Sequence, residues 1–89
     1  MNSYLTRDFL ACFRQLPQDV KEKTRKSYRL WQQNPNHPSL RFKRVHTIEP
    51  IYSVRVGIEW RALGLREGNA IHWFWIGPHD EYDRLLRQF

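Results

Sequence analysis

The spacing of hydrophobic residues changes from a helical period in the first third of the chain to an alternating period in the remainder. At the start, this spacing predicts a short amphipathic helix over residues 4–14, with Thr6 as its cap. The hydrophobic positions that define its buried face, including one just after it, are Leu5, Phe9, Phe13 and Leu16.

A second helix is predicted to begin at Pro17, because proline favours the first helical position and acidic residues follow in the first turn. Its core-facing positions are Val20, Thr24, Tyr28 and Trp31. The segment NPNHP, residues 34–38, ends the helix with two prolines. The two helices are therefore expected to form an antiparallel hairpin.

Apolar and polar residues alternate after residue 40, which predicts β-strands with one buried face. Four strands are expected, over residues 40–43, 52–58, 60–65 and 70–76. Hydrophobic spacing then predicts a short carboxy-terminal helix over residues 79–88. The predicted fold class is α+β, with an amino-terminal helical hairpin packed on a four-stranded antiparallel sheet and all helices on one face.

The segment IHWFWI, residues 71–76, is apolar at successive positions, as in a strand that is covered on both faces. We therefore assign its tryptophans, together with Trp31, to the core. Gly77 and Pro78 end this strand and place two proton-carrying side chains, His79 and Tyr82, directly behind it.

A chain of 89 residues is long enough for one domain, residues 1–89, with a single core. The single cysteine cannot form an internal disulfide, and the polar start lacks the apolar segment of a secretion signal, so a cytoplasmic location is expected. No apolar run approaches the roughly 20 residues that span a bilayer, so no membrane association is expected. No metal-ligand spacing is present, and we predict neither a metal nor a cofactor.

Fifteen Lys and Arg residues against nine Asp and Glu give a formal charge of +6. This charge favours an anionic partner such as RNA, DNA or an acidic protein. Many small basic domains are merely soluble, so the placement of the charges has to identify the partner.

Four segments, in this order and spacing, resemble the RelE/ParE toxin superfamily: LPQDVKEK, NPNHPSLRFKRV, YSVRVGIEWRALG and IHWFWIGPHDEYDRLL. The resemblance covers nearly the whole chain. It implies a compact RelE-like toxin of a type II toxin–antitoxin system, neutralised by an antitoxin. RelE-like members cut mRNA on the ribosome, and ParE-like members poison DNA gyrase without being enzymes.

The resemblance favours an endoribonuclease that needs no metal, in which a ribose 2′-hydroxyl attacks the adjacent phosphate. By motif, Arg61 matches the arginine aimed at the scissile phosphate, and Arg55 matches a basic residue on the neighbouring strand. His79 and Tyr82 match the carboxy-terminal pair. Ser53 departs from the pattern, because some RelE-like enzymes carry a lysine there. A gyrase poison, or an inactive relative that only binds antitoxin, stays open.

The loop length between the two middle strands decides where the arginines lie. A three-residue loop, Gly57 to Glu59, places Arg55 and Arg61 opposite each other on one sheet face, where a phosphate would be held by both. A two-residue loop would place them on opposite faces, each solvated or paired with a carboxylate. We expect the first arrangement, on the face away from the two amino-terminal helices.

His79 is the candidate general acid or base, and the alternative is an exposed or helix-capping histidine. Tyr82 would stack on a base, orient a phosphate, or fill the core. A patch that binds the RNA backbone is predicted from Arg41, Lys43 and Arg44. Trp60, beside Arg61, is the tryptophan expected to reach the RNA. The expected partners are an acidic, amphipathic antitoxin segment, mRNA and the ribosome, with DNA gyrase as the partner under the alternative.

Overall fold

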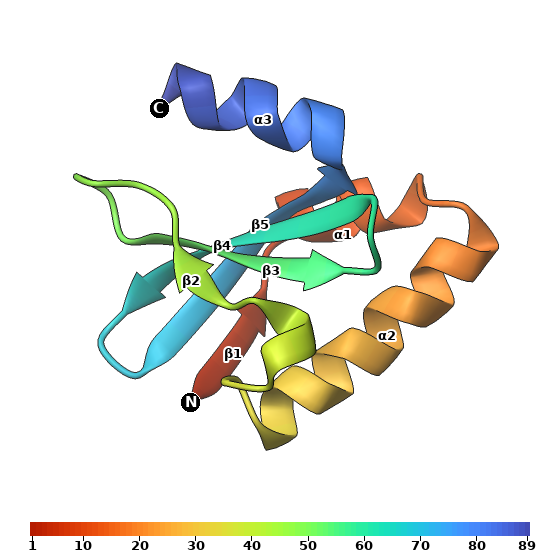
Figure 1. The fold of residues 1–89 in the computed structure, drawn as a ribbon, viewed down its shortest axis with the longest axis horizontal. Coiled ribbons are helices and arrows are strands. Elements are labelled where there is room, and N and C mark those ends of the chain that lie inside the picture. The colour runs from red at the N-terminus through yellow and green to blue at the C-terminus, as the bar shows by residue number, and fades with distance from the viewer.

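The protein folds into a five-stranded sheet with helices on both of its faces (Figure 1). A computed structural model describes all residues, 1–89. The strand order is β1-β5-β4-β3-β2. The strands are β1 (Asn2–Leu5), β2 (Lys43–Arg44), β3 (Ile51–Val56), β4 (Trp60–Glu67) and β5 (Ala70–Pro78). The helices are α1 (Arg7–Arg14), α2 (Gln18–Gln33), the short 3-10 helix η1 (Pro38–Leu40) and α3 (His79–Gln88).

The α+β class is confirmed, but the sheet has one strand more than expected because β1 precedes the first helix. Thr6 is the helix cap, as predicted, and its hydroxyl accepts a hydrogen bond from the backbone N–H of Phe9 at 3.2 Å. Tyr4 and Leu5 lie before this cap, so the expectation that they are helical was wrong. They pair with β5 in parallel, which makes the sheet mixed rather than antiparallel.

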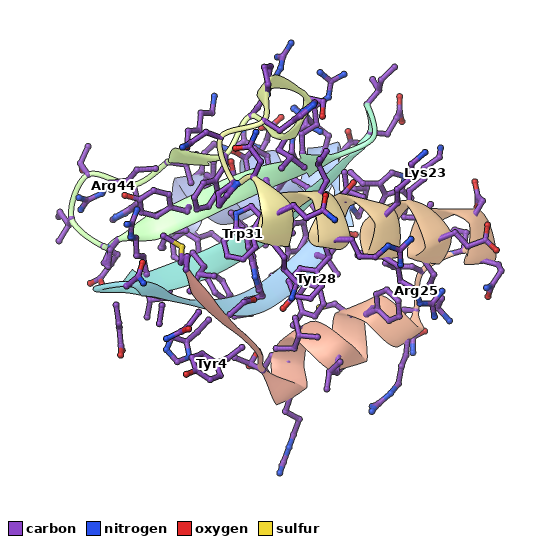
Figure 2. All side chains as sticks on the ribbon, turned by 90° about the horizontal axis from the view of Figure 1, so that it is seen from below. Tyr4, Lys23, Arg25, Tyr28, Trp31 and Arg44 are labelled. Carbon is purple, nitrogen blue, oxygen red and sulfur yellow. The ribbon has the colours of Figure 1, made fainter.

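The antiparallel hairpin of α1 and α2 is confirmed, since α2 runs back in the direction opposite to α1 (Figure 2). Pro17 is the residue before α2 rather than its first residue. The predicted core-facing positions of α2 are correct, with Val20, Thr24 and Trp31 buried and Tyr28 packed against the core.

The expected strand over residues 40–43 was largely wrong. The η1 turn ends with Leu40 inserted into the core at 1% exposure, and Arg41 then adopts a left-handed backbone with φ of 47°. Only Lys43 and Arg44 pair with β3. The chain enters the sheet late because His37 and Pro38 start a turn, in which the His37 ring accepts a hydrogen bond from the Ser39 N–H at 3.2 Å.

The sheet separates two hydrophobic cores. The larger core lies under α1 and α2, and the smaller one, which contains Ile51, Leu63 and Tyr82, lies under α3. The bounds of α3 are as predicted, but the expectation that all helices share one face was wrong (Figure 1). Alternation along the strands explains why, because each strand supplies side chains to both cores.

A register shift at Leu63 and Gly64 explains how β5 accommodates three consecutive aromatic residues. Leu63 pairs with Trp75 and Gly64 with Trp73, so Phe74 has no partner on β4. Trp73 therefore packs in the larger core, whereas Phe74 and Trp75 both pack against the smaller one. The prediction that β5 is covered on both faces is confirmed. None of the helices is both long and apolar enough to cross a membrane.

Candidate functional site

The turn between β3 and β4 brings two arginines together. Val56 pairs with Trp60, which leaves the three residues Gly57 to Glu59 as the loop, and Arg55 pairs directly with Arg61. Directly opposed residues of an antiparallel pair share a face. This face carries α3 and not the helical hairpin, so the predicted arrangement of the pair is confirmed.

Neither arginine has a carboxylate partner. The two ion pairs within 4 Å in the structure each join a histidine to a carboxylate, and no Lys or Arg takes part in one. The alternative in which Arg55 or Arg61 is neutralised by a neighbouring glutamate is therefore excluded. Two unneutralised guanidinium groups in register form a site that favours a bound anion.

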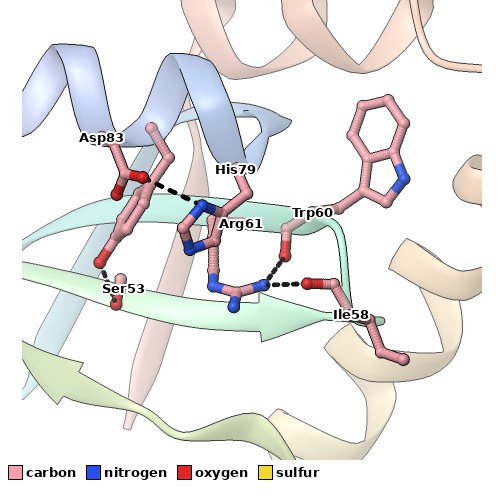
Figure 3. Close-up of polar contacts among 7 residues, drawn as sticks. Ser53, Ile58, Trp60, Arg61, His79 and Asp83 are labelled. Atoms are coloured by element: carbon pink, nitrogen blue, oxygen red, sulfur yellow. Dashed lines mark hydrogen bonds and ion pairs between the residues drawn. The ribbon is translucent and has the colours of Figure 1, made fainter.

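Backbone carbonyls of the turn orient both guanidinium groups, and Figure 3 shows the contacts of Arg61 with the carbonyls of Trp60 and Ile58. Arg61 donates from Nη1 to the carbonyls of Trp60 at 2.8 Å, Ile58 at 3.0 Å and Gly57 at 3.4 Å. Arg55 donates from Nε to the carbonyl of Gly57 at 3.3 Å. The Nε and Nη2 donors of Arg61 and both terminal nitrogens of Arg55 remain free. Each arginine thus keeps a two-donor edge, which suits bidentate phosphate binding.

Burial, followed by the charge of Arg55, lowers the pKa of Arg61 from its ordinary value. The charge of Arg41 lowers this pKa further, while Tyr82 and Asp83 raise it. A lowered pKa means that the site disfavours its own positive charge, and a phosphate would relieve that cost. Arg41, Tyr82 and Asp83 all lie close enough to act on Arg61 electrostatically.

His79 is the first residue of α3 and lies on the same side as the arginine pair. Its backbone N–H donates to the carbonyl of Glu59 at 2.7 Å, which ties α3 to the β3–β4 turn. Its ring Nδ1 lies 3.1 Å from the Asp83 carboxylate, one helical turn away (Figure 3). Because a carboxylate only accepts hydrogen bonds, this contact requires a proton on Nδ1 and leaves Nε2 free. The side chain is 44% exposed, so a ligand could reach it from solvent.

Tyr82 is buried, with 7% of the residue exposed, and its ring belongs to the smaller core. Its hydroxyl donates to the hydroxyl of Ser53, which is also buried, at 3.3 Å. Of the three roles considered from the sequence, the structure supports core packing and opposes stacking on a base. Ser53 fills the position next to the arginine pair where a lysine was noted in relatives, and it holds Tyr82 instead.

Two of the four predicted RNA-binding residues lie near the pair, and two do not. Lys43 is exposed and pairs with Ser53, so it faces the α3 side, and the charge of Arg41 reaches Arg61. Arg44 points elsewhere, because its Nε donates to the carbonyl of His46 at 2.9 Å within the following loop. Trp60 is half-buried against the larger core, on the opposite face from Arg61, so it does not lie beside the arginine pair, and its contact with a ligand stays a prediction.

Asp83 was not recognised as a site residue from the sequence. The available signal was its spacing, because a helix predicted over residues 79–88 brings residues i and i+4 together. No group of three or more His, Cys, Asp and Glu side chains is arranged to hold a metal ion.

Comparison with known proteins identifies the fold. One chain of the RelB–RelE antitoxin–toxin complex from Methanococcus jannaschii superposes with a TM-score of 0.72 at 16% identity, covering 91% of this chain and 96% of that one. A chain of the RelE–RelB complex from Pyrococcus horikoshii OT3 gives a TM-score of 0.67 at 12% identity, covering 86% and 92%. The isolated RelE toxin of E. coli gives 0.63 at 12% identity, covering 99% and 98%.

These identities are low, so the structural likeness establishes the fold alone. A search among curated protein sequences finds no match. The family model of the ParE-like toxin domain matches residues 18–84, which include β2 to β5, α2 and most of α3. The chain therefore belongs to the ParE-like toxin domain family, and its fold is similar to that of RelE toxins.

Proposed function

We propose that this toxin is a RelE-like endoribonuclease that cleaves mRNA on the ribosome, in the cytoplasm, by attack of a 2′-hydroxyl on the adjacent phosphate without a metal. The observation that supports this proposal is the unneutralised pair Arg55 and Arg61, on the same sheet face as a histidine bound to a carboxylate.

The arginine pair supplies the electrostatic part of this reaction. Attack of the 2′-oxygen produces a crowded phosphorane with added negative charge, and its stabilisation lowers the barrier. The free donors of Arg61 would bind two non-bridging oxygens of the scissile phosphate, and Arg55 would bind the same group from the opposite strand. The turn carbonyls fix Arg61 before substrate arrives, so little reorganisation is needed.

His79 supplies the proton transfer. With Nδ1–H bound to Asp83, Nε2 of the neutral ring has a lone pair that can take the proton of the 2′-hydroxyl. The protonated ring can instead deliver a proton to the leaving 5′-oxygen. Tyr82 acts as a positioning residue, because its buried ring anchors the first turns of α3 on the sheet.

An antitoxin is the proposed partner of this toxin. Two of the structurally similar proteins, from M. jannaschii and P. horikoshii, are complexes of RelE with RelB, the first described as an antitoxin–toxin complex. A chain with a formal charge of +6 would bind an acidic antitoxin favourably.

The alternative function is a non-enzymatic poison of DNA gyrase, and the description of the matching family as ParE-like favours it. In that case the pair of His79 and Asp83 has no chemical role. An inactive relative that only binds antitoxin would lack both activities. Measurement of RNA cleavage and of DNA supercoiling with the same protein distinguishes the three.

The direct test is single-turnover cleavage of mRNA on programmed ribosomes. We expect His79→Ala to lower the rate roughly 10²-fold or more through lost proton transfer. We expect Arg61→Ala to lower it about 10²- to 10³-fold through lost stabilisation of the phosphorane. Ribosome binding should change little for His79→Ala.

Two matched controls belong to this test. His72 is also paired with a carboxylate, Glu67 at 3.8 Å, and Arg66 also donates to a turn carbonyl, that of Gly68 at 3.1 Å. His72→Ala and Arg66→Ala should therefore cleave at the wild-type rate. Wild-type rates for folded His79→Ala and Arg61→Ala, with loss of supercoiling in the presence of the toxin, would replace the nuclease assignment by the gyrase one.

A further inference from the structure

The two edges of the sheet differ in length and in charge. At one edge, β2 consists only of Lys43 and Arg44, and both side chains are cationic. Short, charged edge strands resist pairing with a further strand. At the other edge, β1 is four residues long, and residues 1–6 include no charged side chain. The β1 edge is therefore the one that is open to an additional strand.

Only one side of β1 is hydrogen-bonded within the chain. The backbone N–H groups of Asn2 and Thr6 donate to carbonyls on the β5 side, at 2.8 Å and 3.1 Å. Backbone groups alternate between the two sides of a strand, so those of Ser3 and Leu5 point away from β5. No strand lies on that side. Two N–H and two C=O groups are thus available to a strand of another chain.

The side chains at this edge are apolar or aromatic and exposed. Tyr4 is 51% exposed, and one face of its ring stacks on His72 of β5 with centroids 5.0 Å apart. Figure 2 shows Tyr4 at the margin of the molecule, beside β1. Because His72 covers the inner face of the ring, the outer face is free to stack on a second aromatic ring.

We propose that β1 pairs with β1 of a second copy of this chain, antiparallel about a twofold axis. Ser3 of each copy lies opposite Leu5 of the other, which gives four hydrogen bonds between the outward backbone groups. Tyr4 then lies opposite Tyr4 of the second copy, on the face that carries α3. The two tyrosine rings meet between the two His72 rings, and the two sheets become one.

The charge of the chain favours a second copy over an acidic partner at this edge. Two copies with a formal charge of +6 repel each other, and an uncharged edge lets them approach with the least repulsion. An acidic segment would gain no attraction from β1 itself. The contact is small, so we expect a weak dimer with a dissociation constant of about 10⁻⁵ to 10⁻⁴ M.

The dimer goes beyond the proposed function, because it requires neither RNA nor antitoxin. Arg55 and Arg61 lie on β3 and β4, and β5 separates these strands from β1. Both cleavage sites of the dimer would therefore stay open. Cleavage assays at nanomolar toxin, where the chain is monomeric, are independent of this contact, so the two proposals fail separately.

The first test is sedimentation equilibrium of the purified full chain over a range of concentrations. The mass of the wild type should rise from that of one chain towards that of two. Tyr4→Lys places two cations opposite each other across the twofold axis and should weaken the dimer at least about 10-fold. Ile48→Lys is the matched control, because it adds the same charge at an 80% exposed isoleucine between β2 and β3. It should dimerise like the wild type.

A proline variant tests the backbone hydrogen bonds themselves. Leu5→Pro removes an outward N–H group and leaves the β5 side of β1 intact, so it should weaken the dimer while the chain stays folded. Amide exchange of the wild type gives an independent measurement. The Ser3 and Leu5 amides should become protected only as the concentration rises, whereas the Tyr4 and Thr6 amides should be protected throughout.

Several results would overturn the proposal. A wild-type chain that remains monomeric up to about 1 mM would exclude the dimer. A dimer that forms with unprotected Ser3 and Leu5 amides, or that folded Tyr4→Lys and Leu5→Pro leave intact, would place the contact elsewhere. A monomeric wild type whose binding to a copurified antitoxin is lost in Leu5→Pro would assign the β1 edge to the antitoxin instead.

Discussion

Two positive side chains in register repel each other, so an arginine pair without a carboxylate is an unfavourable arrangement for the protein alone. The carbonyl of Gly57 offsets part of this cost, because it accepts hydrogen bonds from both Arg55 and Arg61. This oxygen carries a partial negative charge between the two cations, where a phosphate oxygen would carry a full one. Arg41 is a third cation whose charge acts on Arg61. Its backbone is left-handed, which is an uncommon conformation for a residue with a side chain.

The opposition of the two arginines could be predicted from the sequence because it depends only on loop length and strand period. The roles of their individual nitrogens could not, since they depend on where the turn carbonyls point. The positions of the Tyr82 and Trp60 side chains could not be predicted from the sequence either. An aromatic residue beside a candidate site reaches a ligand or the core according to which face the backbone presents, and both are packed in a core.

Asp83 provides a prediction at this scale. Asp83→Ala removes the acceptor that selects the Nδ1–H form of the His79 ring, so the ¹⁵N shifts of the neutral ring should change from that form towards Nε2–H. If His79 acts through Nε2, cleavage should fall about 10- to 100-fold, as for other residues that orient a functional histidine.

Asp80→Ala is the control for this prediction, because Asp80 lies in the first turn of α3 and forms no ion pair with His79. Like Asp83→Ala, Asp80→Ala removes one negative charge from the amino-terminal half of α3. Asp83→Asn keeps an acceptor oxygen and should retain the tautomer. Unchanged ring shifts in Asp83→Ala would show that the contact does not set the state of His79.

At the scale of elements, periodicity located the helices and the three long strands well, and it failed where one residue changes the local geometry. The helix predicted over residues 4–14 has the correct cap and the wrong start, because parallel pairing with β5 outweighs the local helical pattern. No local signal indicates a parallel partner 68 residues away in sequence, as Asn2 and Ala70 are. The strand expected at residue 40 is replaced by a turn that delivers Leu40 to the core.

Close packing at the end of β5 holds the strand that pairs with Arg61. Gly77 pairs with Arg61, and a Cβ at this position would lie 2.4 Å from Cζ2 of Trp75. Gly77→Ala must therefore displace the Trp75 indole from the smaller core. We expect a loss of about 1–3 kcal/mol in the free energy of unfolding, measured by urea denaturation.

A double-mutant cycle isolates the cause. Trp75→Phe removes the ring atoms that the new methyl group would meet, so Gly77→Ala should cost at least about 1 kcal/mol less in that background. Additive losses would mean that the alanine acts through backbone freedom and not through contact with Trp75.

Over the whole molecule, the sheet divides the surface into two sides that differ in their side chains. The α3 side holds the arginine pair, His79 and Lys43, and the hairpin side holds an apolar groove with a basic rim. The amino-acid composition gives the total charge of +6. It does not show how the cations are distributed over the two sides of the sheet, because that depends on the strand order. Under the proposed function, RNA would depend on the basic residues of the α3 side.

Salt dependence of RNA binding tests this division. A cation that contacts the RNA backbone releases counterions, so its removal lowers the steepness with which affinity falls as salt rises. Lys43→Ala should reduce the slope of log affinity against log salt by about 0.7 for single-stranded RNA, measured by anisotropy with a 2′-deoxy substrate that cannot be cleaved. Lys26→Ala removes the same charge from the hairpin side and should leave the slope unchanged. Equal reductions by the two variants would mean that RNA responds to the net charge of the toxin and not to the α3 side, and the proposed cleavage face would lose its electrostatic support.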